Sequence, residues 1–145
     1  MDLVVEMPTD AIDPLSAEFL PKDFYLPPKP VVLSEIEARG QFNLIHVGSG
    51  SKVDFIIRKD RDFSRTEFAR RLRVPFSENV DTTSATPEDI ILSKLQYYDS
   101  GRFEKHLEDI RGILRVSAGV LDIDYIDEWA SKLNLADLWK DVTRD

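Results

Sequence analysis

The strongest constraint on the fold is a pair of β-type runs, QFNLIHV and KVDFIIR, that flank the four residues GSGS. Both runs are rich in β-branched and aromatic residues, and a short glycine-containing loop between two such runs is typical of a hairpin. The pattern predicts two antiparallel strands between residues 41 and 58. Any fold for this chain therefore has to contain a sheet.

The segment that opens the chain alternates between strand and helix patterns. Residues 3 to 7 are predicted to form a short buried strand. Pro8-Thr9-Asp10 ends this strand and is predicted to supply the N-cap of a helix over about residues 10 to 20. The alternative is that Asp13 is the N-cap and Pro14 the first helical residue, a position where proline is well tolerated. The front of the chain is therefore expected to be mixed α/β.

The segment just before the hairpin contains prolines and a helix-start pattern. Four prolines between residues 21 and 30 predict an extended connection with at most a short edge strand. Ser34 and Glu37 have the spacing of a capping box, which predicts a short helix ended by Gly40.

After the hairpin, Ser64 and Glu67 form a second capping-box pattern that predicts a helix as far as Arg73. An extended piece is predicted from about Val74 to Thr83. The side chains of this helix expected to face inward are Phe68, Ala69 and Leu72.

The second half of the chain is predicted to be helical. In TPEDIILSKLQYY, Thr86 is the expected N-cap and Pro87 the first helical residue, with two acids in the first turn. Gly101 separates this helix from a second one. Its apolar residues recur at helical spacing: Phe103, Leu107, Ile110 and Leu114. Two further short helices are expected at residues 123 to 133 and 135 to 142, docked by Trp129 and Trp139.

Length limits the organisation of the chain. With 145 residues, of which 42% are hydrophobic, it is long enough for one domain with a core and short for two of ordinary size. We expect a single α/β domain, with a mixed sheet and helices over residues 1 to 84 and a helical part over residues 85 to 145.

Composition excludes several classes of protein. The sequence contains no apolar run of about 18 residues and no basic segment followed by an apolar one. We therefore expect a cytoplasmic protein without a membrane partner. It has no cysteine, and His46 and His106 are its only histidines, which argues against a thiolate zinc site and a cysteine nucleophile. A metal would need oxygen ligands, which favour magnesium, manganese or calcium.

Charge is distributed unevenly. The net charge is −8, which argues against a general nucleic-acid coat. Residues 52 to 73 nevertheless hold eight basic residues against four acids. This band is interpreted either as a solvated helix face with ion pairs or as a surface that attracts phosphates. Its basic members are Lys52, Arg58, Lys59, Arg61, Arg65, Arg70, Arg71 and Arg73.

Two common catalytic motifs are absent. GSGS lacks the Lys-Ser/Thr of a phosphate-binding loop and lies between two strands instead of before a helix. The two histidines do not have the spacing from which a Ser-His-Asp triad could be built. Any chemistry is therefore expected from carboxylates.

Two carboxylates lie within apolar strands. Asp2 begins the run DLVV, and Asp54 lies inside KVDFII between Val53 and Phe55. Because side chains alternate along a strand, Asp54 points away from both neighbours and shares a face with Lys52. A buried unpaired carboxylate is costly, so Asp54 either faces water on an edge strand or meets a cation.

This arrangement resembles the nucleotidyltransferase superfamily, which shares the DNA polymerase β fold. In that family a Gly-Ser turn precedes a strand bearing Asp-x-Asp, and a later strand bears a third acid. The resemblance implies that Asp2 matches the second acid of Asp-x-Asp and that Asp54 matches the third. It also implies that these acids are the catalytic metal ligands and hold Mg²⁺, or Mn²⁺ in its place, against a nucleoside triphosphate.

The helical half is similar to a branch of that superfamily, the bacterial nucleotidyltransferases related to AbiEii-type toxins. The similarity lies in ATPEDIILSKLQYYDSGRFEKHLEDIRGIL, where Lys94 and Asp109 match a lysine and an aspartate of those proteins. The resemblance implies that both residues contact the nucleotide. The alternative is a Lys-Asp pair that joins two packed helices.

One part of the family pattern is not in this sequence. The Gly-Ser turn and the first acid of Asp-x-Asp would precede Asp2. We therefore expect either a start upstream, with Met1 as the middle residue of Asp-Met-Asp, or an N-terminally truncated member whose activity is weak or absent. An in-frame Gly-Ser turn and acid before Met1 would support an enzyme, and a stop codon there would contradict one for this chain.

Two functions follow from the sequence. The first is a nucleotidyltransferase-like protein that, with its motif completed, transfers a nucleotidyl group to a hydroxyl of a protein or RNA. The second is a non-catalytic interaction module, such as one component of a toxin-antitoxin-like pair.

Overall fold

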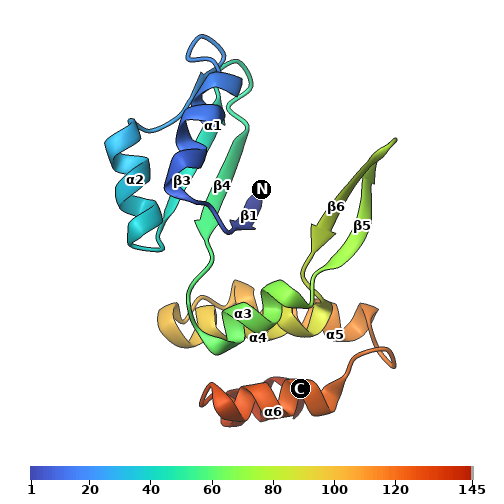
Figure 1. Cartoon of the computed structure of the whole chain (residues 1–145). Helices are drawn as coiled ribbons and strands as arrows, with labels where there is room; N and C mark the ends of the chain where they lie inside the picture. The colour runs from blue at the N-terminus through green and yellow to red at the C-terminus, as the bar shows by residue number, and fades with distance from the viewer. Residues whose placement is uncertain (145) are drawn as a thin grey trace. The chain divides into compact units, whose positions relative to one another are not determined.

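The computed structural model describes residues 1–144 and has a mixed α/β fold, as predicted (Figure 1). The chain divides into two compact units, Met1–Arg65 and Thr66–Asp145. The division falls within helix α3 (Asp62–Ala69), upstream of residue 84, where the sequence changes from mixed to helical patterns. Each unit has its own sheet and its own helices.

The first unit is built on a four-stranded sheet with the order β1-β4-β3-β2. Strands β3 (Gln41–His46) and β4 (Lys52–Ile57) form the predicted hairpin. Strand β1 (Asp2–Val5) pairs with β4 in parallel, and the short edge strand β2 (Phe24–Tyr25) pairs antiparallel with β3. The edge strand predicted within residues 21 to 30 is therefore confirmed. The strand predicted near residues 3 to 7 is also present, but it is not buried: its residues alternate between exposed and half-buried.

Helices pack on one face of this sheet. They are the 3₁₀ turn η1 (Thr9–Ala11) with α1 (Ile12–Glu18), and α2 (Lys29–Glu37). Alternate strand residues are buried against them, because side chains at every second position share a face. The resulting core contains Ile12, Val32, Ile36, Phe42, Leu44, Phe55 and Ile57.

Two helix starts in this unit differ from the predictions. Asp13 is not an N-cap: the 3₁₀ turn leads directly into α1, and Asp13 is its second residue, with an ion pair of 2.6 Å to Lys29 Nζ. Pro14 is accommodated because first-turn amides lack intrahelical partners. Helix α2 begins at Lys29 and not at Ser34, since Pro30 fits a first-turn position and starts the helix earlier than the capping-box pattern indicates.

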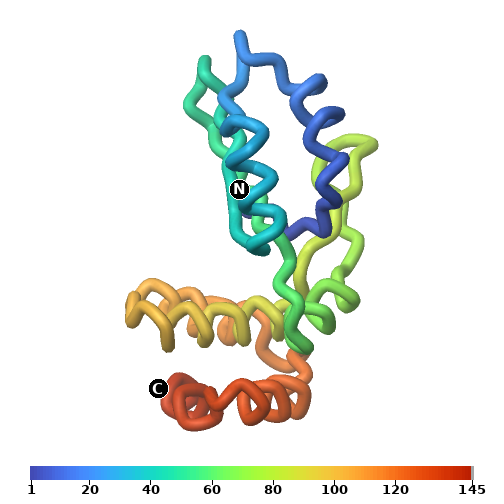
Figure 2. Tube along the Cα trace, turned by 60° about the vertical axis from the view of Figure 1, so that its left-hand side comes forward, coloured from blue at the N-terminus to red at the C-terminus, as the bar shows by residue number. Residues whose placement is uncertain are grey.

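Besides the end of α3, the described part of the second unit contains four helices, which lie in two layers (Figures 1 and 2). Helices α4 (Pro87–Gly101) and α5 (Lys105–Val116) form one layer, and α6 (Ile123–Lys132) and α7 (Ala136–Arg144) form the other. The predicted N-cap of α4 is confirmed, because the Asp89 amide donates a 3.2 Å hydrogen bond to Thr86 Oγ1. Buried side chains between the layers include Leu92, Leu95, Ile110, Ile126 and Trp139.

Three residues differ from the predictions. Phe103 was expected within the second helix, but it precedes α5 and is 68% exposed, whereas Leu107 and Ile110 lie in α5 and are buried. Ala69 is exposed at the last position of α3, and Leu72, outside this helix, is also exposed. Helix α3 ends at Ala69 and β5 begins at Leu72, so the chain becomes extended sooner than the capping box suggested.

An antiparallel ribbon follows α3 and is the extended piece predicted near residues 74 to 83. Its strands are β5 (Leu72–Ser77) and β6 (Val80–Ser84), with a bulge between Pro75 and Ser77. They form a separate two-stranded sheet (Figure 1). No helix within residues 1–144 is both long enough and apolar enough to cross a membrane.

Candidate functional site

Asp2 and Asp54 are partners in the register of the first sheet. Strands β1 and β4 run parallel, and the Cα of Asp2 pairs with that of Asp54. Directly paired residues on neighbouring strands point to the same face, and the strands lie about 4.8 Å apart. The structure therefore brings these two sequence-predicted carboxylates side by side, although 51 residues separate them in the chain.

Asn43 extends this row of polar residues to a third strand. It pairs with Asp54 in the antiparallel register of β3 and β4, so Asp2, Asp54 and Asn43 lie in line across the sheet. Their face is opposite to the one that Phe42 and Phe55 bury against the helices. The alternation in QFNLIH could have indicated Asn43, but only the register places it beside Asp54.

The two alternatives for Asp54 are resolved by its neighbours. β4 lies between β1 and β3, so the edge-strand interpretation is wrong. Lys52 Nζ lies 3.1 Å from Asp54 Oδ2, and the Asp54 side chain is 22% exposed. Asp54 is thus a partly buried carboxylate that meets a cation from its own strand.

This polar row matches magnesium in the chemistry of its donors. Magnesium prefers oxygen ligands and commonly uses one or two carboxylates, with water and substrate phosphates completing its shell. Asp2 and Asp54 supply two carboxylates, and Asn43 supplies an amide oxygen. Among residues 1–144 there is no cluster of three or more His, Cys, Asp or Glu side chains arranged to hold a metal.

Lys94 and Asp109 form an ion pair within the second unit. Lys94 Nζ on α4 lies 2.6 Å from Asp109 Oδ2 on α5. The hydrogen bond from Lys94, assisted by its charge, lowers the pKa of the Asp109 carboxyl below its ordinary value. The predicted alternative, a pair that joins two packed helices, describes this geometry.

The Lys94–Asp109 pair also lines an open cleft of about 580 Å³. The walls between α4 and α5 are largely apolar, with Ile90 on one side and Ile113 on the other. Asp2 and Asp54 belong to the first unit, whereas Lys94 and Asp109 belong to the second. Each pair is assembled within its own unit.

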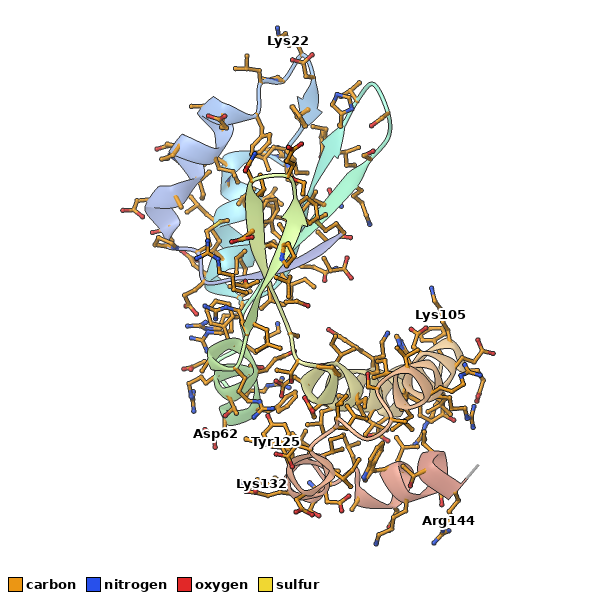
Figure 3. All side chains as sticks on the ribbon, turned by 90° about the vertical axis from the view of Figure 1, so that its right-hand side faces the viewer. Lys22, Asp62, Lys105, Tyr125, Lys132 and Arg144 are labelled. Atoms are coloured by element: carbon orange, nitrogen blue, oxygen red, sulfur yellow. The ribbon has the colours of Figure 1, made fainter. Side chains whose placement is uncertain are left out.

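A buried hydrogen-bond network around Asp89 was not predicted from the sequence. Asp89 is fully buried at the start of α4, and its carboxylate accepts three hydrogen bonds. The donors are Thr86 Oγ1 at 2.7 Å, Tyr125 Oη at 2.6 Å and Arg70 Nε at 3.2 Å. The Arg70 guanidinium also lies 3.8 Å from the centre of the Tyr125 ring, which points from α6 into this cluster (Figure 3). The network joins three segments and satisfies the buried charge.

Protonation of the neighbouring groups follows from this burial. Burial, followed by the hydrogen bond to Asp89, raises the pKa of the Tyr125 hydroxyl. Burial also raises the pKa of Glu67, although the hydrogen bond from Ser93 opposes this effect. For Glu88, burial is outweighed by hydrogen bonds, led by that from the Asp122 amide, so its pKa is lowered. The sequence indicated only that Glu88 and Asp89 suit the helix dipole.

The basic band of residues 52 to 73 is largely engaged in ion pairs. Arg65 contacts Asp60 and Asp62, Arg73 contacts Asp81, and Arg58 contacts Glu6. These residues lie on two strands, a loop and a helix, so the band is not a single helix face. The ion-pair interpretation accounts for these contacts without a phosphate.

Comparison of the chain with models of known protein families finds no match, and comparison with curated proteins finds no relative.

Proposed function

We propose that this protein is a nucleotidyltransferase-like protein whose first unit binds Mg²⁺ and a nucleoside triphosphate through Asp2 and Asp54. The observation that carries the proposal is the register pair of these two acids on neighbouring parallel strands. They lie on the face opposite the helices, where ligand atoms can reach them, and Asn43 offers a further oxygen. A structural role alone gives no reason for two acids to be paired here, since like charges directly opposite each other destabilise a sheet.

The chemistry proposed is transfer of a nucleotidyl group to a hydroxyl of a protein or RNA. The hydroxyl oxygen loses its proton to water and forms a bond to the α-phosphorus. The bond from that phosphorus to the oxygen that bridges it to the β-phosphate breaks, and pyrophosphate leaves. Asp2 and Asp54 would hold the metal, whose charge would stabilise the phosphate oxygens. On the family resemblance, Lys94 and Asp109 are proposed to contact the nucleotide, with Lys94 supplying a compact cation for phosphate.

Binding can be tested by thermal unfolding with Mg²⁺ and each nucleoside triphosphate in turn. A ligand at about ten times its dissociation constant stabilises the native state by about 1.4 kcal/mol. For a chain of this size, the melting temperature should then rise by roughly 3 to 5 °C. We expect such a rise with at least one triphosphate only when Mg²⁺ or Mn²⁺ is present.

Matched variants assign the effect to the proposed residues. Asp54→Asn should abolish the rise, because it removes a ligand charge while keeping the side-chain shape. Asp10→Asn removes an exposed acid from the same unit and should leave the rise unchanged. Lys94→Gln tests the second unit and should weaken nucleotide binding. Failure of every triphosphate to shift the melting temperature would contradict the proposal.

A second candidate is the non-catalytic interaction module. It is favoured by the contact between Lys52 and Asp54, in which a cation already neutralises one of the two acids. In this case the sheet would serve as a scaffold for a protein partner, such as the other component of a toxin-antitoxin-like pair. It predicts no metal-dependent shift and no difference between Asp54→Asn and Asp10→Asn.

A further inference from the structure

The ribbon of β5 and β6 has two strands and exposes apolar side chains. Leu72 is 51% exposed and Val80 is 49% exposed. Both lie on the face that also carries Val74 and Thr82, since these positions alternate in phase along the paired strands. Two-stranded ribbons are marginally stable in water, and a third strand or a covering layer is usually needed. The ribbon therefore lacks the third strand or covering layer that usually stabilises such a pair.

The two edges of the ribbon differ in their hydrogen-bonding capacity. Pro75 on β5 pairs with Asp81 and has no amide hydrogen. Proline fits a strand where its nitrogen faces away from the neighbouring strand, so the outer edge of β5 lacks a donor at this point. The bulge beside Pro75 disrupts the same edge further. The edge of β5 is thus poorly suited to bind another strand.

The outer edge of β6 is suited to binding a strand. Along a strand of an antiparallel pair, the main-chain groups of successive residues point alternately toward the partner strand and away from it. Because Pro75 has no amide hydrogen, Pro75 and Asp81 form a non-hydrogen-bonded pair. Thr82 then forms main-chain hydrogen bonds to β5, while Asp81 and Thr83 direct their amides and carbonyls outward. β6 contains no proline, no lysine and no bulge of its own, the features that commonly protect a free edge. Its only charged residue, Asp81, is paired with Arg73 Nε at 2.8 Å.

We propose that two copies of this chain associate by antiparallel pairing of β6 with β6. With the two-fold axis at Thr82, Asp81 of each copy lies opposite Thr83 of the other. Both residues direct their main-chain groups outward, so the register forms two hydrogen-bonded pairs with four main-chain hydrogen bonds. A two-fold interface must be self-complementary, and this strand meets that condition.

The side chains of β6 are also compatible with this pairing. The two Thr82 residues form a cross-strand Thr–Thr pair, a favourable combination in sheets. No acid faces another acid, because Asp81 meets Thr83 and retains Arg73 on its own ribbon. The product is a four-stranded sheet with a continuous apolar face that contains Leu72, Val74 and Val80 from each copy. A second copy therefore supplies the strands that the ribbon lacks.

Single cysteines test this register directly, because the chain has no cysteine of its own. In the proposed dimer the two Thr82 Cα atoms would be about 4.5 Å apart, within the range for a disulfide. The two Thr83 Cα atoms would be about 8 Å apart, beyond that range. Under mild oxidation, Thr82→Cys should give several-fold more covalent dimer on non-reducing gels than the matched Thr83→Cys.

The mass in solution provides the second measurement. Light scattering should give twice the 16.6 kDa mass of one chain. Thr83→Pro removes an outward amide and should give the monomer mass, whereas Thr83→Ala should remain dimeric. A monomeric wild-type chain over a wide concentration range, or equal cross-linking of the two cysteine variants, would overturn the proposal. Either result would point to another occupant of the ribbon, and neither depends on nucleotide binding.

Discussion

Asp54 is partly buried and Asp89 is fully buried, and the surroundings of the two carboxylates differ. Asp54 lies beside Asp2 on the sheet face opposite the helices, its side chain is 22% exposed, and its ion-pair partner Lys52 is about half exposed. Asp89 has no exposed surface, and Arg70, Tyr125 and Thr86 all donate hydrogen bonds to it. The Asp54 carboxylate therefore has oxygen lone pairs available for a ligand, whereas the lone pairs of Asp89 are used in hydrogen bonds within the protein.

This difference separates a candidate site from a structural network. Burial alone would rank Asp89 first, because its charged side chain has no exposed surface. Its carboxylate, however, is fully hydrogen-bonded, and the network links α4 to α6 and to the end of α3. A ligand at Asp89 would have to displace these donors. At Asp54 it would displace only a surface lysine.

The largest expected effect is on stability at the network. Asp89→Ala leaves the Tyr125 hydroxyl and the Arg70 guanidinium without their acceptor and should reduce the free energy of unfolding by about 3 kcal/mol. This is the lower end of the range for a broken buried pair, because the Arg70 side chain is partly exposed. Urea unfolding followed by tryptophan fluorescence would measure it, since both tryptophans lie in the second unit.

The matched control is Asp99→Ala on the same helix. Asp99 is exposed and forms an ion pair with Arg102 three residues away, so the change should be below about 1 kcal/mol. Equal destabilisation by the two variants would show that the network adds no stability.

The sequence predicted local structure better than the contacts between segments. The hairpin, the α4 cap at Thr86 and the last two helices follow from short-range patterns of turn residues, caps and apolar spacing. The start of α2 was mispredicted because Ser34 and Glu37 match a capping box by chance in mid-helix. Pro28 and Pro30 suggested an extended chain, but Pro28 is the N-cap of α2 and Pro30 lies in its first turn.

The candidate site could be predicted in residue type but not in geometry. Asp2 and Asp54 stand out because acids are rare within apolar strands, and a parallel register then pairs them. Tyr125 and Arg70 carry no such local signal, and the alternation in QFNLIH indicates the face of Asn43 but not that Asp54 lies beside it. Their roles arise from the pairing of strands and helices distant in the chain, which no residue spacing reveals.

A pH-dependent effect is expected at the edge of the network. Burial raises the pKa of Glu67 above its ordinary value of 4.5, so the native state binds more protons than the unfolded state at intermediate pH. Stability attributable to this group then falls as the pH rises above 4.5, and the loss is complete above the native pKa. Glu67→Gln keeps an acceptor for Ser93 and removes the charge.

The variant should match the wild type in stability near pH 4 and exceed it increasingly toward pH 7. Urea unfolding at several pH values would measure the difference. The control is Glu128→Gln, which alters an exposed acid on α6. A constant difference across this range for Glu67→Gln would show that Glu67 is ionised equally in both states.

The smallest expected change in stability, and the sharpest test of the open site, comes from Lys52→Gln. The pair with Asp54 involves a half-exposed lysine, so its loss should change the free energy of unfolding by less than about 1 kcal/mol. Removing a competing cation should, however, increase the affinity for Mn²⁺, measured by electron paramagnetic resonance, by roughly two- to fivefold. Lys22→Gln removes an exposed lysine from the same unit and should leave this affinity unchanged. If both variants bind Mn²⁺ as the wild type does, Lys52 is no competitor for the ion, and Asp54 resembles Asp89 more closely than its exposure suggests.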